Sequence, residues 1–270
     1  MVSTDVERGL GRGFARGHAA LVAYVMAGYP DRASSHEALS ALVSGGADVI
    51  ELGVPYADPV ADGPVIASAG RHALASGFGL AEAIELAAEF SAACPEAPPI
   101  ALMTYVNPLL RRGFERAASE AAEAGVSGFI VPDLPPDQPF AQKWRSACEA
   151  HGLDTVFLAA PTSTPARLEA VGACSSGFVY LVSSLGVTGE RATLAEDLPS
   201  LVATMREYTT LPVAVGFGVS KPEQAAKVAR VAEGVVVGSA LVRRQHDAGS
   251  LERQVRQIAE AVHAVPISPR

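Results

Sequence analysis

The chain has 270 residues, of which 49% are hydrophobic and 6% aromatic, and its formal net charge at pH 7 is -8. This length suits one large α/β barrel, and the negative charge argues against binding to nucleic acid or to anionic membranes. The three cysteines, Cys94, Cys148 and Cys174, are widely spaced and odd in number, so we expect neither a metal motif nor a disulfide framework and predict a cytoplasmic location.

The N-terminal segment, residues 6–16, is interrupted by arginine and glycine and lacks the hydrophobic core of a signal peptide. We predict a short amphipathic helix here that closes the bottom of a barrel. No apolar stretch is long enough to span a bilayer.

Short apolar segments then alternate with alanine-rich helical patterns along the chain. The segments are continuously apolar, which is typical of parallel strands covered on both faces. Thr164-Pro165 and a capping box at residues 220–223 mark two helix starts. The candidate strands are residues 20–26, 48–53, 100–105, 128–132, 155–159, 178–183, 212–216 and 234–238. The pattern predicts a single (β/α)8 TIM-barrel domain over residues 1–270 with a short N-terminal helix. An open doubly wound sheet is the alternative, but no glycine fingerprint follows the first strand.

The second candidate strand carries a lone glutamate, Glu51, and leads into a proline-rich loop that holds Asp58 and Asp62. Active sites of this fold lie at the C-terminal ends of the strands, so these acids converge on one mouth of the barrel. Burial would raise the pKa of Glu51, whereas Asp62 on a loop would ionise more easily. The pair could therefore divide acid and base roles, or Glu51 could be a salt-bridged core residue beside ordinary turn aspartates.

Three glycine-rich segments follow the last three predicted strands: residues 183–189, residues 216–218, and Gly238-Ser239. Glycine allows backbone N–H groups to approach an anion, and late strands form the usual phosphate site of such barrels. Each segment alone could equally be a tight turn.

The remaining residue types narrow the chemistry. The lysines, Lys143, Lys221 and Lys227, fall in or near predicted helices, so none is an obvious Schiff-base residue. No histidines cluster at the predicted strand ends, which argues against a metal-dependent aldolase. What remains is cofactor-free acid–base chemistry by carboxylates on a phosphorylated substrate.

Residues 51–64 closely resemble the signature of the tryptophan synthase alpha chain family, and the similarity extends from about residue 19 to about residue 245. The family usually has serine where this chain has Ala57. The resemblance implies retro-aldol cleavage of indole-3-glycerol phosphate to indole and glyceraldehyde 3-phosphate. It makes Glu51 the proton donor and acceptor, and Asp62 the partner of the indole N–H. It implies no metal and no cofactor in this chain, with pyridoxal phosphate only in a partner beta chain.

The resemblance also assigns binding roles. It places the substrate phosphate on Gly189, Gly218, Gly238 and Ser239. It makes Thr188 part of a lid that closes over the Asp62 loop, and it makes Tyr180 a lining residue. An indole pocket needs apolar walls, and the candidates near the first strand ends and the seventh strand are Leu21, Tyr24, Ile66 and Phe217, although each could be ordinary core.

Alpha chains of this family bind a beta chain in an alpha2beta2 heterotetramer. The segments that match the family's partner-facing loops are residues 55–58, 105–108 and 131–136. The alternative is that they are ordinary rim loops of a barrel, stiffened by proline. The interface residues implied are Pro55, Asp58, Asn107, Pro108 and Asp133. Alanine at position 57 cannot make the local hydrogen bond that serine makes.

Three hypotheses follow. The chain is the alpha subunit of a heteromeric tryptophan synthase, or a stand-alone lyase that releases free indole, or a weakly catalytic subunit that activates a beta chain. Intact Glu51, Asp62 and phosphate glycines disfavour the third.

Overall fold

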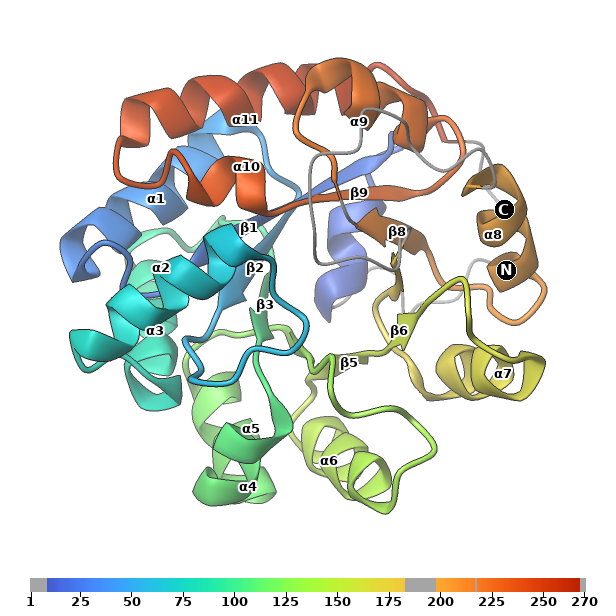
Figure 1. Cartoon of the computed structure of the whole chain (residues 1–270), viewed down its shortest axis with the longest axis horizontal. Coiled ribbons are helices and arrows are strands. Elements are labelled where there is room, and N and C mark those ends of the chain that lie inside the picture. Colours follow the sequence, from blue (N-terminus) through green and yellow to red (C-terminus); the bar gives the residue numbers. More distant parts are fainter. Residues whose placement is uncertain (1–8, 183–197, 217, 268–270) are drawn as a thin grey trace.

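The structure is a computed structural model that describes residues 9–182, 198–216 and 218–267. Its strands form one parallel sheet that curls into a ring, with the helices outside it (Figure 1). The strands are β1 (Ala20–Met26), β2 (Val49–Gly53), β3 (Ile100–Met103), β4 (Gly128–Ile130), β5 (Asp154–Val156), β6 (Leu158–Ala159), β7 (Val179–Val182), β8 (Val213–Gly216) and β9 (Gly234–Val237). The helices are η1 (Gly9–Phe14), α1 (Arg32–Gly45), α2 (Pro64–Ala75), α3 (Leu80–Ala93), α4 (Val106–Arg112), α5 (Phe114–Glu123), α6 (Pro139–Ala150), α7 (Pro165–Cys174), α8 (Leu198–Arg206), α9 (Pro222–Ala229), α10 (Ser239–Val242) and α11 (Ala248–His263).

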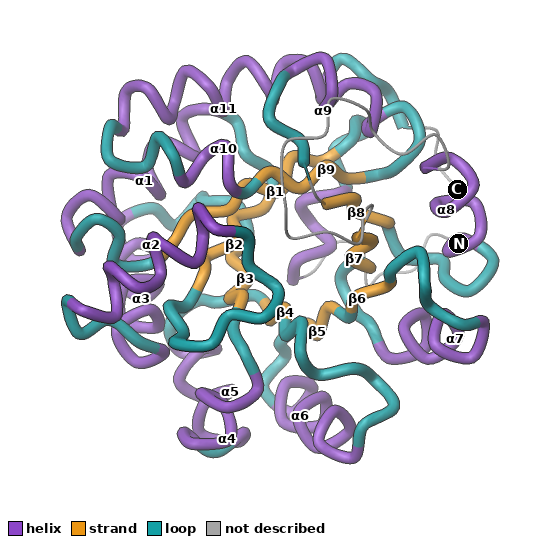
Figure 2. Tube along the Cα trace, in the orientation of Figure 1, coloured by secondary structure: helices purple, strands orange, loops and turns teal. Residues whose placement is uncertain are grey.

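The predicted barrel is confirmed, with one correction in its fifth strand. Strand order runs β5-β4-β3-β2-β1-β9-β8-β7-β6, and Figure 2 shows the strands arranged in a ring. The predicted strand 155–159 is divided into β5 and β6 at Phe157. The N–H of Phe157 donates to the Ser175 hydroxyl at 3.2 Å, so a side chain takes the place of a strand neighbour at this point. The chain itself joins β5 to β6 and completes the ring.

Two cores lie on opposite faces of the sheet. Because side chains alternate along a strand, neighbours in sequence enter different cores. Leu21 and Ile50 belong to the outer core between sheet and helices. Val22 and Val49 belong to the inner core that fills the barrel.

A short N-terminal helix closes the bottom of the barrel, as predicted, although its described part, Gly9–Phe14, is a 3-10 helix that ends two residues before the expected segment does. Leu10 and Phe14 of η1 join the inner core, and the Phe14 ring lies 5.1 Å from the Phe178 ring. The Leu10 N–H donates to Asp154 Oδ2 at 2.7 Å. Side chains of the described part of η1 therefore pack into the lower end of the barrel.

Both predicted helix starts are present, and one is displaced by a residue. The Thr164 hydroxyl accepts from Arg167 N at 3.3 Å and caps α7. At α9 the capping side chain is Gln224, which accepts from Lys221 N at 3.1 Å and from Ser220 N at 2.9 Å. Glu223, the residue expected in this role, lies in the first turn.

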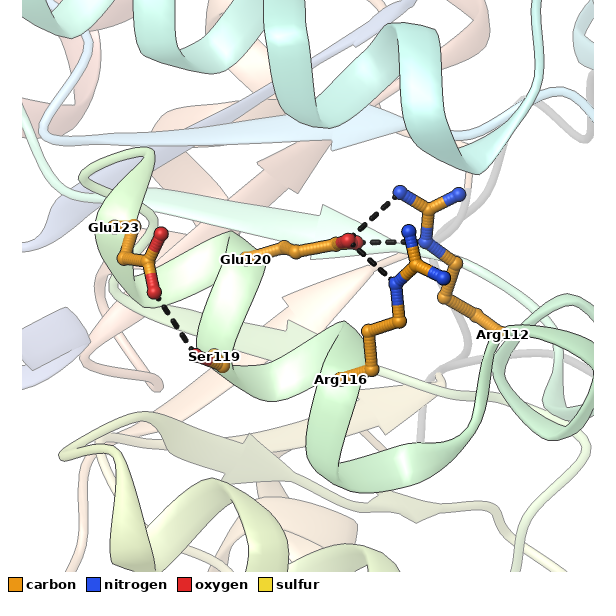
Figure 3. Close-up of polar contacts among 5 residues, drawn as sticks. All are labelled: Arg112, Arg116, Ser119, Glu120 and Glu123. Carbon is orange, nitrogen blue, oxygen red and sulfur yellow. Dashed lines mark hydrogen bonds and ion pairs between the residues drawn. The ribbon is translucent and has the colours of Figure 1, made fainter.

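An ion-pair cluster fixes α4 to α5, as drawn in Figure 3. The Arg112 guanidinium donates to both oxygens of Glu120, at 2.7 and 2.9 Å, and Arg116 Nε donates to Glu120 at 2.8 Å. Two donors in a fork hold a carboxylate in a defined orientation. Helix α4, which carries Asn107 and Pro108, is thereby held against its neighbour.

Candidate active site

Glu51 points into the barrel from the middle of β2. It pairs in register with Tyr24 of β1 on one side and with Ala101 of β3 on the other. Only 3% of the residue is exposed, and its Oε2 has no hydrogen-bond partner among the described residues. Burial, with a smaller contribution from the charge of Asp62, raises its pKa to about 8. Glu51 is therefore protonated near neutral pH.

Asp62 reaches the same space from the loop between β2 and α2. Burial raises its pKa to about 6, and a hydrogen bond with the Tyr105 hydroxyl acts in the opposite direction. The same hydroxyl accepts from Ala61 N at 3.1 Å, which ties the loop to the end of β3. The two acids thus differ in pKa, which gives one a proton to donate while the other stays charged.

A cavity of about 270 Å³ joins these carboxylates to the glycine turns. Tyr24, Ile66 and Tyr180, three of the residues proposed from the sequence to surround the substrate, are among the residues that line it. Further lining side chains that sequence reasoning did not identify are Met103, Ile130, Leu158, Val236 and Arg243.

Leu21 requires a correction. It was expected to form an apolar wall of the pocket, but its side chain faces the helices in the outer core. The reason is strand alternation: Tyr24 faces the barrel, so Leu21, an odd number of residues away, faces the opposite side.

The glycine turns lie at the same mouth as Asp62. Gly218, Gly238 and Ser239 line the cavity. Gly218 has a φ of 79°, a left-handed conformation that glycine adopts without strain. A Cβ on Gly238 would lie 3.4 Å from Ile66 Cδ1, so a side chain there would approach the opposite wall. The predicted Gly189, Thr188 and Phe217 lie outside the described residues.

Arg243, the residue after α10, is also among the residues that line the cavity. No motif marks it in the sequence. Its spacing from Ser239, one helical turn, is the signal that could have found it, because residues four apart share a helix face.

The predicted partner-facing segments form a connected rim. The Tyr56 ring stacks on Tyr105 with centroids 4.9 Å apart, and the Tyr56 hydroxyl accepts from Asn107 Nδ2 at 2.9 Å. Asp133 Oδ1 accepts from Val106 N at 2.9 Å. The same Tyr105 that stacks on this rim contacts Asp62, so rim and site share a side chain.

Not all rim residues are available to a partner. Pro55 is buried, whereas Ala57 and Asp58 are exposed. Two large apolar side chains are also exposed, one on the same loop and one on α4: Val60 is 67% exposed and Leu110 is 41% exposed. Single exposed apolar side chains are common on protein surfaces, so these two do not by themselves identify an interface.

The lysines and histidines lie away from the cavity. None of them is among its lining residues in the described part of the chain. His18 and His263 do lie close to Asp48. His18 precedes β1 and Asp48 precedes β2, so this group lies at the opposite end of the barrel from the cavity. No described helix combines the length and apolar character needed to cross a bilayer.

The chain is similar to known proteins over most of its length. The family model described as "Tryptophan synthase alpha chain" matches residues 12–266. The tryptophan synthase alpha chain of Solibacter usitatus is 50% identical over 83% of this chain and 82% of that protein. That of Methanosarcina mazei is 47% identical over 89% and 86%.

Solved structures give the same result. A structure of Mycobacterium tuberculosis tryptophan synthase superposes with a TM-score of 0.87 at 43% identity, covering 95% of this chain and 98% of that one. A mutant alpha subunit from the hyperthermophile Pyrococcus furiosus has a TM-score of 0.81 at 37% identity, with 90% and 99% covered.

Proposed function

The chain belongs to the tryptophan synthase alpha chain family and has the alpha-subunit role, and we propose that Glu51 and Asp62 carry its lyase reaction. The substrate is indole-3-glycerol phosphate and the products are indole and glyceraldehyde 3-phosphate. The observation that carries the proposal is the pair of carboxylates with unlike pKa values in one cavity whose far side holds Gly218, Gly238 and Ser239.

Protonation begins the reaction. The protonated Glu51 gives its proton to C3 of the indole, and the ring becomes an iminium-like electron sink. The ionised Asp62 accepts a hydrogen bond from the indole N–H and stabilises the positive charge that develops there. A pKa of about 8 leaves Glu51 protonated at neutral pH, and a pKa of about 6 leaves Asp62 mostly ionised.

Cleavage returns the proton. Glu51, now a carboxylate, takes the proton from the hydroxyl on the side-chain carbon next to C3. The O–H electrons form the aldehyde of glyceraldehyde 3-phosphate as the carbon–carbon bond breaks. The electrons of that bond neutralise the iminium and restore indole, so Glu51 ends the cycle protonated. This sequence requires no metal, cofactor or Schiff base.

The opposite end of the cavity binds the phosphate in this proposal. Backbone N–H groups at Gly218, Gly238 and Ser239 would donate to its oxygens, with Gly189 added by resemblance. Arg243 supplies a positive charge near the same turns. Tyr24, Ile66 and Tyr180 would enclose the indole, and Thr188 would belong to a lid over Asp62.

A beta chain is the partner that family membership implies, and an alpha2beta2 assembly is the stoichiometry we propose. The docking surface would include Asp58, Asn107 and Pro108, with Pro55 and Asp133 supporting the loops from below. Pyridoxal phosphate would be bound only by the beta chain. The free thiols of Cys94, Cys148 and Cys174 suit the reducing cytoplasm that we propose as its location.

Indole release by the purified chain, with and without a beta chain, tests the function. Slow release alone and faster release in the mixture supports the alpha-subunit role. Fast release alone would instead indicate a stand-alone lyase, and no release with stimulation of the partner would indicate a regulatory subunit.

The residue roles have their own test. Glu51→Gln and Asp62→Asn should each reduce kcat about 10²–10⁴-fold, the usual contribution of a positioned acid or base. Asp58→Asn, an exposed carboxylate on the same loop, is the matched control and should retain the rate of isolated alpha chain. Near-normal kcat in either active-site variant would contradict the assignment.

A further inference from the structure

A second group of polar side chains lies at the bottom of the barrel, away from the catalytic cavity. It consists of His18 before β1, Asp48 before β2 and His263 at the end of α11, each offering one ligand atom, and these atoms lie within 4.8 Å of one another. The imidazole rings of His18 and His263 are 4.0 Å apart. The proposed mechanism uses none of these residues.

Backbone groups hold the cluster in place. Asp48 is fully buried, and its Oδ2 accepts from Leu21 N at 2.8 Å. The Nδ1 of His18 lies 3.0 Å from the carbonyl oxygen of Ala19, and an Nδ1–H donated to this carbonyl would leave Nε2 as the atom with a free electron pair. Such outer contacts orient metal-binding imidazoles in known sites.

One carboxylate oxygen of the cluster accepts no hydrogen bond from the described residues. Asp48 Oδ1 makes no hydrogen bond with the described residues, although it is buried; it faces Arg16 Nη1 at 3.5 Å. The other oxygen lies 2.8 Å from His263 Nε2. A fully buried carboxylate is costly unless its charge is matched by hydrogen bonds or by a cation.

We propose that His18, Asp48 and His263 bind one divalent transition-metal ion, with Zn²⁺ as the best match. Two imidazoles and a carboxylate are ligands that Zn²⁺ accepts, at about 2.0–2.2 Å each, and water can take a fourth position. Ligand atoms within 4.8 Å can converge on one ion by small side-chain rotations. Because His18 and His263 are only half-buried, the ion has a path from solvent.

The ion would connect three parts of the chain that are far apart in sequence. Asp48 and His18 lie at the entrances of adjacent strands, and His263 ends the last helix. A ligand that binds only the folded state stabilises it by mass action, so Zn²⁺ should raise the melting temperature. Arg16 competes for Asp48, but its side chain is 53% exposed and can move into water.

Calorimetric titration of the tag-free full chain with Zn²⁺, together with visible absorption of the Co²⁺-loaded chain, tests the site. We expect one equivalent to bind and Co²⁺ to give the absorption of a four-coordinate site. His18→Gln and His263→Gln should each weaken binding at least about tenfold and abolish the Zn²⁺-dependent rise in melting temperature. Arg16→Gln should strengthen binding, since it removes the competing charge.

His246→Gln is the matched control, because His246 is exposed and outside the cluster, and it should bind Zn²⁺ like the parent chain. The proposal is overturned if no saturable one-to-one binding is found. It is equally overturned if both cluster variants bind as the parent does, since the ion would then be adventitious. Circular dichroism of each variant tests whether it is folded, so that weaker Zn²⁺ binding can be separated from a loss of structure.

Discussion

Glu51 and Asp62 face one cavity, and burial together with the negative charge of Asp62 raises the pKa of Glu51 to about 8. Burial raises the pKa of Asp62 to about 6. The reactive form, with Glu51 protonated and Asp62 ionised, therefore predominates between these values. We predict a bell-shaped dependence of kcat/KM on pH for indole release, with apparent limbs near 6 and 8 that belong to the coupled pair. A rate that stays constant across this range would exclude the proposed division of roles.

Neutralising Asp62 should lower the pKa of Glu51. Asp62→Asn removes the charge that disfavours ionisation of Glu51, while burial of Glu51 remains. The expected pKa is lower than about 8 but still above the ordinary value of 4.5. A carboxyl NMR titration of Glu51 measures this directly and does not depend on residual activity. Asp58→Asn, on the exposed part of the loop, should leave the Glu51 titration in place.

Glu51 should also make the fold less stable as the pH rises. The pKa is 4.5 as an ordinary value and about 8 in the folded chain, so the folded state prefers the protonated form. The unfolding free energy is then unaffected by this group below pH 4.5, falls as the pH rises toward 8, and stays low above it. The glutamine of Glu51→Gln cannot ionise, so the unfolding free energy of this variant should not show that decrease with pH.

We therefore expect Glu51→Gln to be more stable than the parent chain at pH 7 by about 3 kcal/mol, with the advantage shrinking toward acidic pH. Urea unfolding of both proteins over a range of pH values measures the difference. An advantage that does not grow with pH would show that Glu51 is not held protonated by the fold.

Tyr105 should lower the pKa of Asp62. Its hydroxyl forms a hydrogen bond with Asp62 that lowers the pKa of that carboxyl. Tyr105→Phe keeps the ring stacked on Tyr56 but removes this hydrogen bond, so the pKa of Asp62 rises and the acidic limb of the kcat/KM profile moves to higher pH. Tyr56→Phe is the control: its hydroxyl contacts Asn107, and the acidic limb should stay where it is. A shift of equal size in both variants would contradict a specific role of the Tyr105 hydroxyl.

The fold, and the convergence of Glu51 and Asp62 on one cavity, could be predicted from the sequence for physical reasons. Continuous apolar strands and alternating helices leave few alternatives to a barrel, and a carboxylate inside an apolar strand marks Glu51 at once. Asp62 follows because the loop after the same strand must lie at the same end of the barrel. Gly218, Gly238 and Ser239 line the cavity for the same reason, since each follows the C-terminal end of a strand.

The remaining features depend on packing across the barrel, which local patterns do not contain. Met103 and Leu158 look like ordinary core in the sequence, and only the closure of the ring brings them to the cavity. The interruption at Phe157 involves the Ser175 hydroxyl, which lies beyond the end of α7 and is brought back to the strand only by the packing of that helix. The error at Leu21 was avoidable, because residues 21 and 24 of one strand cannot face the same side.

Gly53 should be indispensable to the shape of the cavity wall. A Cβ at this position would lie 2.0 Å from the Tyr24 hydroxyl oxygen and 2.4 Å from Tyr24 Cζ. Gly53→Ala must therefore displace the Tyr24 ring, which lines the cavity, and overpacking of this kind costs typically about 1–3 kcal/mol. We expect a lower melting temperature and a higher KM for indole-3-glycerol phosphate.

A double-mutant cycle isolates the cause. Tyr24→Leu ends before the two atoms that the new Cβ would meet, so Gly53→Ala should cost less in that background than in the parent chain. Gly249→Ala is the matched control, since a Cβ there meets no atom closer than 3.5 Å and the position lies in the first turn of α11. It should leave stability unchanged or raise it slightly, because alanine restricts the unfolded chain. Equal costs of Gly53→Ala with and without the Tyr24 ring would mean that the strand backbone, and not the ring, requires glycine.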